Sequence, residues 1–167
     1  YKEKIIIRQE KSPQGTGGAI RYSSLKNNND KVVINGDTIF NIDFNQFYDT
    51  LSKTCDVGIG VKHVKKSKYK DSGFIKIDEN MNVLSFNEKK DIHDNLEFVF
   101  INIGIYYFKH DVLAAFSKKT PLSLEYDVFP SLINNYSFKA FNYDDILIDY
   151  GTLKGYKDAQ DYFSNHK

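Results

Sequence analysis

The sequence has little of what marks several specialised classes of protein. Its 167 residues include a single cysteine, Cys55, which excludes an internal disulfide and favours a reducing compartment. The longest apolar run, FVFINIGIYYF at 98–108, is interrupted by Asn102 and Gly104 and is far shorter than the ~18 residues that a membrane-spanning helix needs. No basic segment followed by an apolar one resembles a leader peptide. These absences favour a soluble cytoplasmic protein with no membrane partner.

Net charge is close to zero, because 23 Lys and Arg residues are balanced by 22 Asp and Glu residues. This balance argues against bulk binding of nucleic acids, so any charge-dependent chemistry is expected to be local. Hydrophobic residues make up 41% of the chain and aromatic residues 15%, which is enough to fill the core of one domain. We therefore expect a single domain over residues 1–167. Its oligomeric state is open, a homo-oligomer included.

The common phosphate-binding motifs GxGxxG and GxxxxGK are both absent from the sequence. A parallel sheet built from βαβ units usually opens on a strand followed by such a loop, whose backbone N–H groups hold phosphate. This chain starts instead with the strand-like run at 4–10. We therefore expect it to begin inside a domain, without an N-terminal nucleotide-binding segment.

What the sequence does contain is an alternation of strand and helix patterns. Short runs rich in Val and Ile predict buried strands, and apolar residues spaced three and four apart predict helices. Alternating residues around an Asp-Glu-Asn turn predict a β-hairpin at 73–89. This order predicts an α/β fold with a mixed, mostly parallel sheet. The expected strands cover 4–10, 31–36, 56–64, 98–108, 138–143 and 145–151, and the expected helices cover 19–25, 44–54, 111–118, 123–135 with Ser123 as N-cap, and 156–163.

A glycine-rich loop at 10–20 precedes the first expected helix. Gly15, Gly17 and Gly18 flank Thr16, and residues without Cβ let backbone N–H and C=O groups approach a flat or anionic ligand closely. The N-terminus of the helix behind the loop favours negative charge. The loop therefore suits a nucleotide, although a plain strand-to-helix turn has the same composition.

Two aspartates follow apolar strands close to a glycine. Asp37 ends the segment VVINGD, and Asp149 ends ILID just ahead of Gly151. A carboxylate at the carboxyl edge of a sheet is a natural ligand of Mg²⁺, which takes one or two carboxylates and fills its other positions with water and phosphate oxygens. Either residue alone could equally be a helix N-cap or a turn residue. We expect both carboxylates to converge on one magnesium ion, because without a cation they would repel each other.

Six segments of the chain occur in a recognisable order: QGTGGAI, VVINGDTIF, SGFIKIDENMNVLSFNEK, FINIGIYYFKHDVL, LSLEYDVFPSLI and ILIDYGTLKGYKDAQ. In this order, over nearly the whole chain, they resemble the sugar-1-phosphate nucleotidyltransferases, also called nucleotide-sugar pyrophosphorylases. Within that family the sequence is most similar to guanylyltransferases acting on D-glycero-D-manno-heptose 1-phosphate or mannose 1-phosphate. The resemblance implies a three-layer, Rossmann-like (GT-A-like) domain. It also implies an NDP-sugar product for capsule, lipopolysaccharide or other surface polysaccharide.

The implied reaction is attack of a sugar 1-phosphate oxygen on the α-phosphate of a nucleoside triphosphate, GTP favoured, with release of pyrophosphate. Such chemistry depends on alignment and charge neutralisation more than on a protein nucleophile. By resemblance, Asp37 and Asp149 hold Mg²⁺ and form the catalytic set together with Lys89, which lies on the sugar phosphate. The implied nucleotide contacts are Gly15, Thr16, Gly17 and Gly36, and the implied sugar contacts are Ser72, Gly73 and Glu88, with Asn102 and Gly104 as the pocket floor.

Several of these residues also have a simpler interpretation. Glu88 and Lys89 lie in the run NEKKD, where they could form a solvated charge pair, and Asn102 could be a buried amide satisfied by its neighbours. The motif context favours the functional interpretation of all three. Glu125 and Asp127 are expected to support the fold or the sugar pocket indirectly. The four histidines show no metal-ligand spacing.

The sequence departs from the family in one respect. The family's AGGxGTRL-type loop, followed by a Pro-Lys, grips the triphosphate, and neither is found here. The difference is on the order of two βαβ units, ~60 residues, so we expect this chain alone to be catalytically silent or nearly so. Two alternatives stay open: a non-catalytic sugar-phosphate or nucleotide-sugar binding relative of the same fold, and a GT-A glycosyltransferase. The latter would need an Asp-x-Asp motif, which the spacing of Asp37 and Asp43 does not provide.

Overall fold

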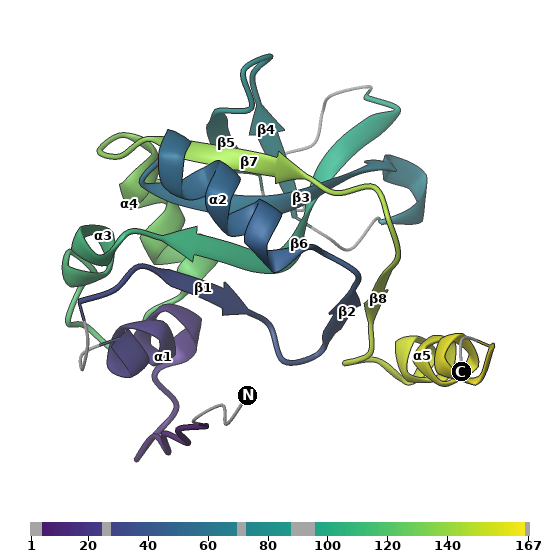
Figure 1. Ribbon diagram of the computed structural model, residues 1–167, viewed down its shortest axis with the longest axis horizontal. Coiled ribbons are helices and arrows are strands. Elements are labelled where there is room, and N and C mark those ends of the chain that lie inside the picture. Colours follow the sequence, from purple (N-terminus) through teal and green to yellow (C-terminus); the bar gives the residue numbers. More distant parts are fainter. Residues whose placement is uncertain (1–4, 25–27, 70–72, 88–95, 166–167) are drawn as a thin grey trace.

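The computed structural model describes residues 5–24, 28–69, 73–87 and 96–165. They form a six-stranded mixed sheet, a separate two-stranded ribbon and helices, so the expected α/β class is confirmed (Figure 1). A π-helical turn at Leu124–Val128 leads into α4, and a 3-10 turn at Lys66–Lys68 follows β3. The elements are α1 (Gly15–Ser24), β1 (Lys31–Ile34), β2 (Thr38–Phe40), α2 (Phe44–Thr54), β3 (Val57–Lys65), β4 (Phe74–Ile77), β5 (Val83–Asn87), β6 (Phe98–Phe108), α3 (His110–Ala114), α4 (Phe129–Ile133), β7 (Phe138–Asn142), β8 (Leu147–Asp149) and α5 (Leu153–Asn165).

The long apolar strand β6 lies at the centre of the sheet. β3 pairs with it along one side, while β4 and β1 share the other side, β4 next to Ile101 and β1 from Ile105 onward. β7 extends the sheet beyond β3, and β5 forms the expected hairpin with β4. Because β6 runs against its three neighbours, β3–β7 is the only parallel pair in the described part of the chain. The prediction of a mostly parallel sheet is therefore wrong, since an apolar pattern shows burial but not strand direction.

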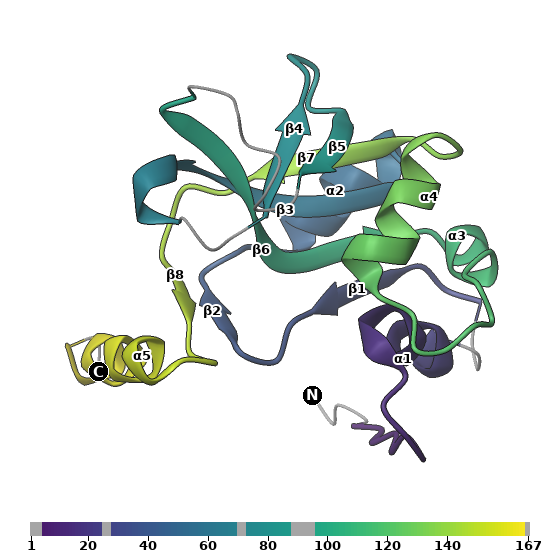
Figure 2. The same cartoon turned by 180° about the vertical axis from the view of Figure 1, so that it is seen from behind.

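Helices cover both faces of this sheet, which gives the expected three layers. Successive side chains of a strand point to opposite faces, and β6 shows this alternation clearly. Tyr106 and Phe108 pack in one core with residues of α3 and α4, whereas Ile105 and Tyr107 pack in a second core with residues of α2. Figures 1 and 2 show α2 on one face of the sheet and α4 on the opposite face. Every residue from 103 to 108 is consequently buried.

Two helical segments begin at polar caps. The Asp43 side chain accepts hydrogen bonds from the backbone N–H groups of Asn45 and Gln46 and so starts α2. Ser123 is the cap that the sequence predicted for the turn before α4, and its hydroxyl oxygen accepts a hydrogen bond from the N–H of Tyr126. None of the helices in the described ranges has the length and apolar character needed to cross a bilayer.

The strand expected at 4–10 is not formed. Residues 5–10 have no regular structure, and Ile5, Ile6 and Ile7 expose 86%, 60% and 89% of their surface. A strand requires a hydrogen-bonded neighbour, and no strand of the described residues pairs with this segment. The apolar run predicted a strand, but it could not supply the pairing partner that a strand needs.

The ribbon formed by β2 and β8 carries the C-terminal helix. Its antiparallel register aligns Thr38 with Asp149, and α5 continues from β8 at one end of the molecule (Figure 1). Tyr143 ties the ribbon to the main body, because its hydroxyl accepts from the N–H of Asn41 at 2.6 Å and donates to the carbonyl oxygen of Ile146 at 2.7 Å. This ribbon determines where Asp37 and Asp149 lie relative to each other.

Candidate active site

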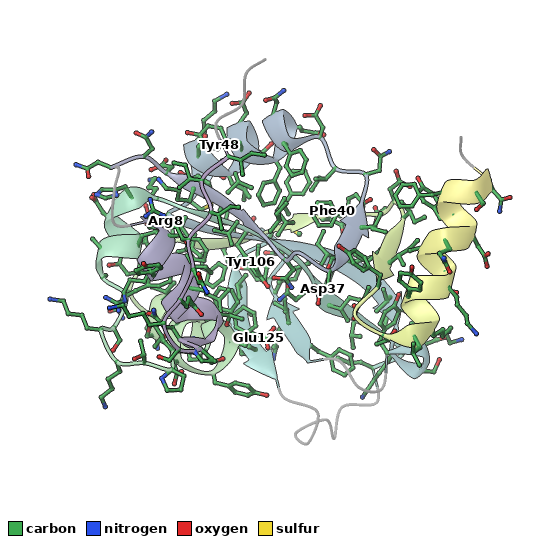
Figure 3. The ribbon with its side chains drawn as sticks, turned by 90° about the horizontal axis from the view of Figure 1, so that it is seen from below. Arg8, Asp37, Phe40, Tyr48, Tyr106 and Glu125 are labelled. Atoms are coloured by element: carbon green, nitrogen blue, oxygen red, sulfur yellow. The ribbon has the colours of Figure 1, made fainter. Side chains whose placement is uncertain are left out.

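A cavity of about 630 Å³ lies between α1, β1 and the turn that precedes α4. This volume is typical of sites for small organic ligands. Figure 3 shows Tyr106 and Glu125 near the middle of the molecule, with Asp37 beside them. The residues most relevant to its chemistry are Thr16, Asn35, Gly36, Tyr106, Ser123 and Glu125.

Asp37 and Asp149 lie close together at the end of the ribbon where β2 begins and β8 ends. The N–H of Tyr150 donates to the backbone oxygen of Asp37 at 2.9 Å, and the N–H of Gly151 donates to Asp149 Oδ1 at 2.9 Å. A Cβ added to Gly151 would lie 3.1 Å from Asp37 Oδ2 and 3.2 Å from Asp149 Oδ1. The two carboxylate oxygens are therefore no farther apart than the sum of these distances. The expected proximity of the two side chains is confirmed.

The chemistry of this pair suits a divalent cation. Both side chains are exposed, and in the described part of the chain no basic side chain forms an ion pair with either. Two carboxylates of like charge held this closely repel each other unless a cation lies between them. No cluster of three or more His, Cys, Asp or Glu side chains occurs among the described residues, and a pair of carboxylates is the set that Mg²⁺ prefers. Metal binding at Asp37 and Asp149 stays a prediction.

The glycine-rich segment is the first turn of α1 rather than a loop ahead of it. Gly15 has a φ of +75°, and a Cβ there would lie 2.5 Å from the carbonyl oxygen of Leu122. The N–H groups of Gly17 and Gly18 donate to that same oxygen at 2.9 and 3.3 Å. Gly15 and Gly17 thus hold α1 against Leu122, and only Thr16 of the predicted nucleotide contacts in this segment lines the cavity.

A β-bulge in β6 lies next to the cavity residue Tyr106. The β3–β6 register shifts between Ile59 and Val61, opposite residues 102–106 of β6, and Gly104 within this bulge has a φ of +80°. Bulges bend a strand and re-aim its side chains. Here the bulge lets Asn102 Nδ2 donate to Tyr106 Oη at 2.8 Å, four residues along the same strand. Neither Asn102 nor Gly104 is among the described residues that line the cavity, so their role as the pocket floor stays a prediction.

Tyr106 and Glu125 are cavity residues that the sequence interpretation did not assign to substrate. Burial raises the pKa of Tyr106 to about 12, while hydrogen bonds from Asn102 and Asn35 lower it and the carboxylates of Glu125 and Asp37 raise it. Asn102 Nδ2 also donates to Glu125 Oε1 at 3.3 Å. Tyr106 is hidden in a run of apolar residues, so the sequence offers no signal that its hydroxyl reaches a cavity.

The remaining predicted sugar contacts are only partly placed. Ser72, Glu88 and Lys89 lie outside the described residues. Gly73 is exposed and directly precedes Phe74, whose register partner Ile101 is adjacent to Asn102. The β4 end of the hairpin thus starts beside the strand that carries Asn102 and Gly104.

Comparison with known proteins identifies relatives of the whole described fold. The chain matches the nucleotidyl transferase family over residues 2–165. It is 32% identical over 153 residues to a D-glycero-alpha-D-manno-heptose 1-phosphate guanylyltransferase of Campylobacter jejuni, covering 92% of this chain and 65% of the relative. It is 29% identical over 137 residues to a mannose-1-phosphate guanylyltransferase of Mycobacterium tuberculosis, covering 81% of this chain and 37% of that relative.

Solved structures show the same similarity. HddC from Yersinia pseudotuberculosis superposes with a TM-score of 0.78 at 29% sequence identity, over 92% of this chain and 64% of that one. The same protein complexed with GMP-PN gives a TM-score of 0.76. The chain thus spans 64–65% of the length of the Yersinia and Campylobacter proteins. Since the family match runs through all but the last residues at each end, the chain belongs to the nucleotidyl transferase family.

Proposed function

We propose that this protein joins a nucleoside triphosphate, GTP in preference, to a manno-configured sugar 1-phosphate of the heptose or mannose type. An oxygen of the sugar phosphate attacks the α-phosphorus, the bond to the β-phosphate oxygen breaks, and pyrophosphate leaves. The products are an NDP-sugar and pyrophosphate. We further propose that the reaction takes place in the cytoplasm and that the NDP-sugar is used for surface polysaccharide.

The observation that carries this proposal is the convergence of Asp37 and Asp149 beside a cavity of ligand size. These two side chains would hold Mg²⁺, which would neutralise the phosphate charge as it shifts towards the leaving group. Asp37 belongs to the turn that follows β1, and residues 35 and 36 of that turn line the cavity. If the triphosphate binds at the two carboxylates, either its nucleoside or the sugar 1-phosphate that attacks it would therefore lie in the cavity.

Two further residues of the cavity suit a ligand of this size. Nothing lies within 4 Å of the position that a Cβ on Gly36 would occupy, so a ligand can approach the backbone there closely. Thr16 Oγ1 accepts a hydrogen bond from the N–H of Leu124 at 2.9 Å, which leaves its hydroxyl hydrogen to donate to a ligand. Ser72, Glu88 and Lys89 remain the proposed contacts to the sugar phosphate.

The relatives support the choice of substrates. The Campylobacter and Mycobacterium proteins are named as guanylyltransferases of a manno-heptose 1-phosphate and of mannose 1-phosphate. The Yersinia structure contains GMP-PN, a guanine nucleotide analogue. A guanine nucleotide and a manno-configured sugar are accordingly the first substrates to test.

A donor screen on the full-length gene product tests this proposal. GTP, CTP, UTP and dTTP are each supplied with Mg²⁺ and either mannose 1-phosphate or D-glycero-D-manno-heptose 1-phosphate, and released pyrophosphate is measured. We expect turnover with GTP and poorer turnover with the other donors. A preference for UTP or dTTP would reject the guanylyl assignment, and binding without pyrophosphate release would favour a non-catalytic relative.

The metal role is tested in the same assay. Asp37→Asn keeps the size of the side chain and removes its charge, so we expect kcat to fall by about 100-fold or more, as for loss of one preorganised catalytic group. Asp158→Asn makes the same charge change on the exposed surface of α5 and is the matched control. Equal activity of the two variants would contradict the role of Asp37.

A further inference from the structure

The side chain of Asn102 is fully occupied by the protein itself. Its Nδ2 donates to Tyr106 Oη at 2.8 Å and to Glu125 Oε1 at 3.3 Å, which uses both of its hydrogens. Its Oδ1 accepts from the N–H of Gly104 at 2.8 Å. Asn102 therefore has no donor left for a substrate. What it does is hold the phenol and the carboxylate next to each other at the cavity wall.

Glu125 keeps most of its capacity to accept hydrogen bonds. Of its two carboxylate oxygens, Oε1 receives one hydrogen bond from Asn102, and a carboxylate has about four lone-pair positions. The side chain is exposed, lines the cavity, and forms no ion pair with a basic side chain of the described residues. A free carboxylate without a cation repels phosphate and attracts hydrogen-bond donors. The part of a ligand that faces Glu125 is therefore not anionic and carries O–H or N–H groups.

Tyr106 adds a donor to this acceptor. Its oxygen already accepts a hydrogen bond from the side-chain amide of Asn102, and its hydroxyl hydrogen is left to donate to a ligand. The phenol is protonated at neutral pH, as an ordinary tyrosine is, and burial raises the pKa of Tyr106 further, to about 12. A hydroxyl group is the common ligand group that can accept from a phenol and donate to a carboxylate at the same time.

We propose that Tyr106 and Glu125 together recognise one hydroxyl group of a substrate, with Asn102 as the positioning residue that holds them in register. The inference rests on the proposed function, because it assigns this recognition to the two substrates named there. Both substrates carry hydroxyl groups: the sugar 1-phosphate on its ring, and the nucleotide on its ribose. Glu125 is thus a direct contact and determines specificity rather than supporting the pocket from outside.

The test compares substrates that lack a single hydroxyl. For the full-length gene product, kcat/KM is measured with mannose 1-phosphate and its 2-, 3-, 4- and 6-deoxy analogues, and with GTP, 2′-deoxy-GTP and 3′-deoxy-GTP. We expect one of these analogues to lose about 10- to 100-fold in kcat/KM, as for a hydrogen bond to a charged group. A loss with a deoxy sugar identifies the sugar as the source of the hydroxyl, and a loss with a deoxynucleotide identifies the ribose.

Variants then show whether these residues cause the discrimination. In Glu125→Gln and Tyr106→Phe, kcat/KM for the parent substrate should fall towards the value for the sensitive analogue. The ratio of these two kcat/KM values should therefore approach 1. Asn102→Ala should lower the same ratio, which a purely structural role would leave unchanged. Asp127→Asn is the matched control. Asp127 belongs to the same turn but accepts from the N–H of Ser123 at 2.7 Å, so the ratio should persist.

The outcomes separate this inference from the proposed function. Turnover with no sensitive deoxy analogue, or a ratio that stays unchanged in both Glu125→Gln and Tyr106→Phe, overturns the hydroxyl assignment and leaves the proposed function intact. Absence of pyrophosphate release with every pair of substrates overturns both. If Glu125→Gln fails to fold, Tyr106→Phe decides, because it removes one hydroxyl and leaves the charge of the site unchanged.

Discussion

Gly151 lies between the two carboxylates of the candidate metal site. A methyl group at this position would lie 3.1 Å from Asp37 Oδ2 and 3.2 Å from Asp149 Oδ1, so the carboxylates would have to move by a few tenths of an ångström. We expect Gly151→Ala to weaken the binding of Mg²⁺, or of Mn²⁺ as its substitute, by about tenfold, equivalent to ~1.4 kcal/mol. Calorimetric titration of the protein with MnCl₂ measures this affinity.

Gly36→Ala is the control for this substitution. Gly36 precedes Asp37, but its added methyl group would meet nothing within 4 Å, and its backbone does not require a positive φ. We therefore expect metal affinity to stay within about twofold of the wild-type value, since no carboxylate has to move. If both alanine variants bind Mn²⁺ as tightly as the wild type, the space between Asp37 and Asp149 is not a metal site.

At the scale of elements, α5 depends on a second glycine for its contact with β8. A Cβ on Gly155 would lie 1.6 Å from the backbone oxygen of Asp149, so any larger residue pushes the first turn of α5 off the end of that strand. We expect Gly155→Ala to destabilise the protein by about 1–3 kcal/mol, as for an overpacked contact. Urea unfolding measures the loss, and hydrogen exchange should show faster exchange in α5.

The same substitution should also affect the metal site. Asp149 is the last residue of β8, so displacement of its backbone moves the carboxylate as well. Metal affinity should fall in Gly155→Ala, whereas Gln160→Ala, on the exposed side of α5, should leave both stability and affinity close to wild type. Normal exchange rates in α5 of Gly155→Ala would show that the helix does not rely on this close contact.

Asp56 connects the start of β3 to the segments before β7 and α3. Its Oδ1 accepts from Lys109 Nζ at 2.8 Å, and its Oδ2 accepts from the N–H of Ser137 at 3.1 Å. The hydrogen bond from Lys109 is the main cause of the lowered pKa of Asp56. A carboxyl group with a lowered folded-state pKa stabilises the protein above its unfolded value of about 3.9, and this contribution is lost as pH falls through the folded value.

We therefore expect the stability difference between wild type and Asp56→Asn to depend on pH. The wild type should be more stable at pH 6–7 by an amount that shrinks as pH falls below about 4, where the carboxyl group becomes protonated. Urea unfolding of both proteins between pH 3 and pH 7 measures this. A stability difference that is constant over that range would show that the charge of Asp56 does not contribute to stability.

At the scale of the whole molecule, apolar side chains are exposed in the segment before α1 and on β1. Ile5 and Ile7 are 86% and 89% exposed, and Val32 and Ile34 of β1 are 37% and 51% exposed. In the described part of the chain β1 pairs only with β6, so its other edge is not covered by a second strand of the described residues. Exposed apolar edges of this kind promote association between chains.

We expect the 167-residue chain to self-associate with rising concentration, and the double variant Ile5→Lys, Ile7→Lys to do so less, because charged side chains in place of exposed apolar ones oppose association. Light scattering over a concentration series measures the association. Leu96→Lys, at a residue 57% exposed elsewhere, serves as the control. Equal association of the two variants would show that residues 5–7 do not contribute.

Most of the strands and helices could be predicted from local patterns. The apolar runs at β1, β3 and β6 and the helical spacing in α2 depend on neighbouring residues only, and Ser123 was identified as a cap from its position before the helix. The failures involve partners far along the chain. Residues 5–10 have no pairing strand among the described residues, and the position of β6 between β1, β3 and β4 made the sheet mainly antiparallel.

The candidate site likewise has features that the sequence could predict and features that depend on the tertiary structure. The sequence alone determined the class of fold and the resemblance to sugar-1-phosphate nucleotidyltransferases. It also determined the choice of Asp37 and Asp149, because a charged residue directly after an apolar strand can be recognised from the sequence. Only the tertiary structure decided that the β2–β8 ribbon brings these two carboxylates together. It also decided that Asn102 holds Tyr106 and Glu125 at one cavity wall. Those contacts depend on strand register and on the bulge at Gly104, and register is set by pairing between segments distant in the chain, which no local pattern specifies.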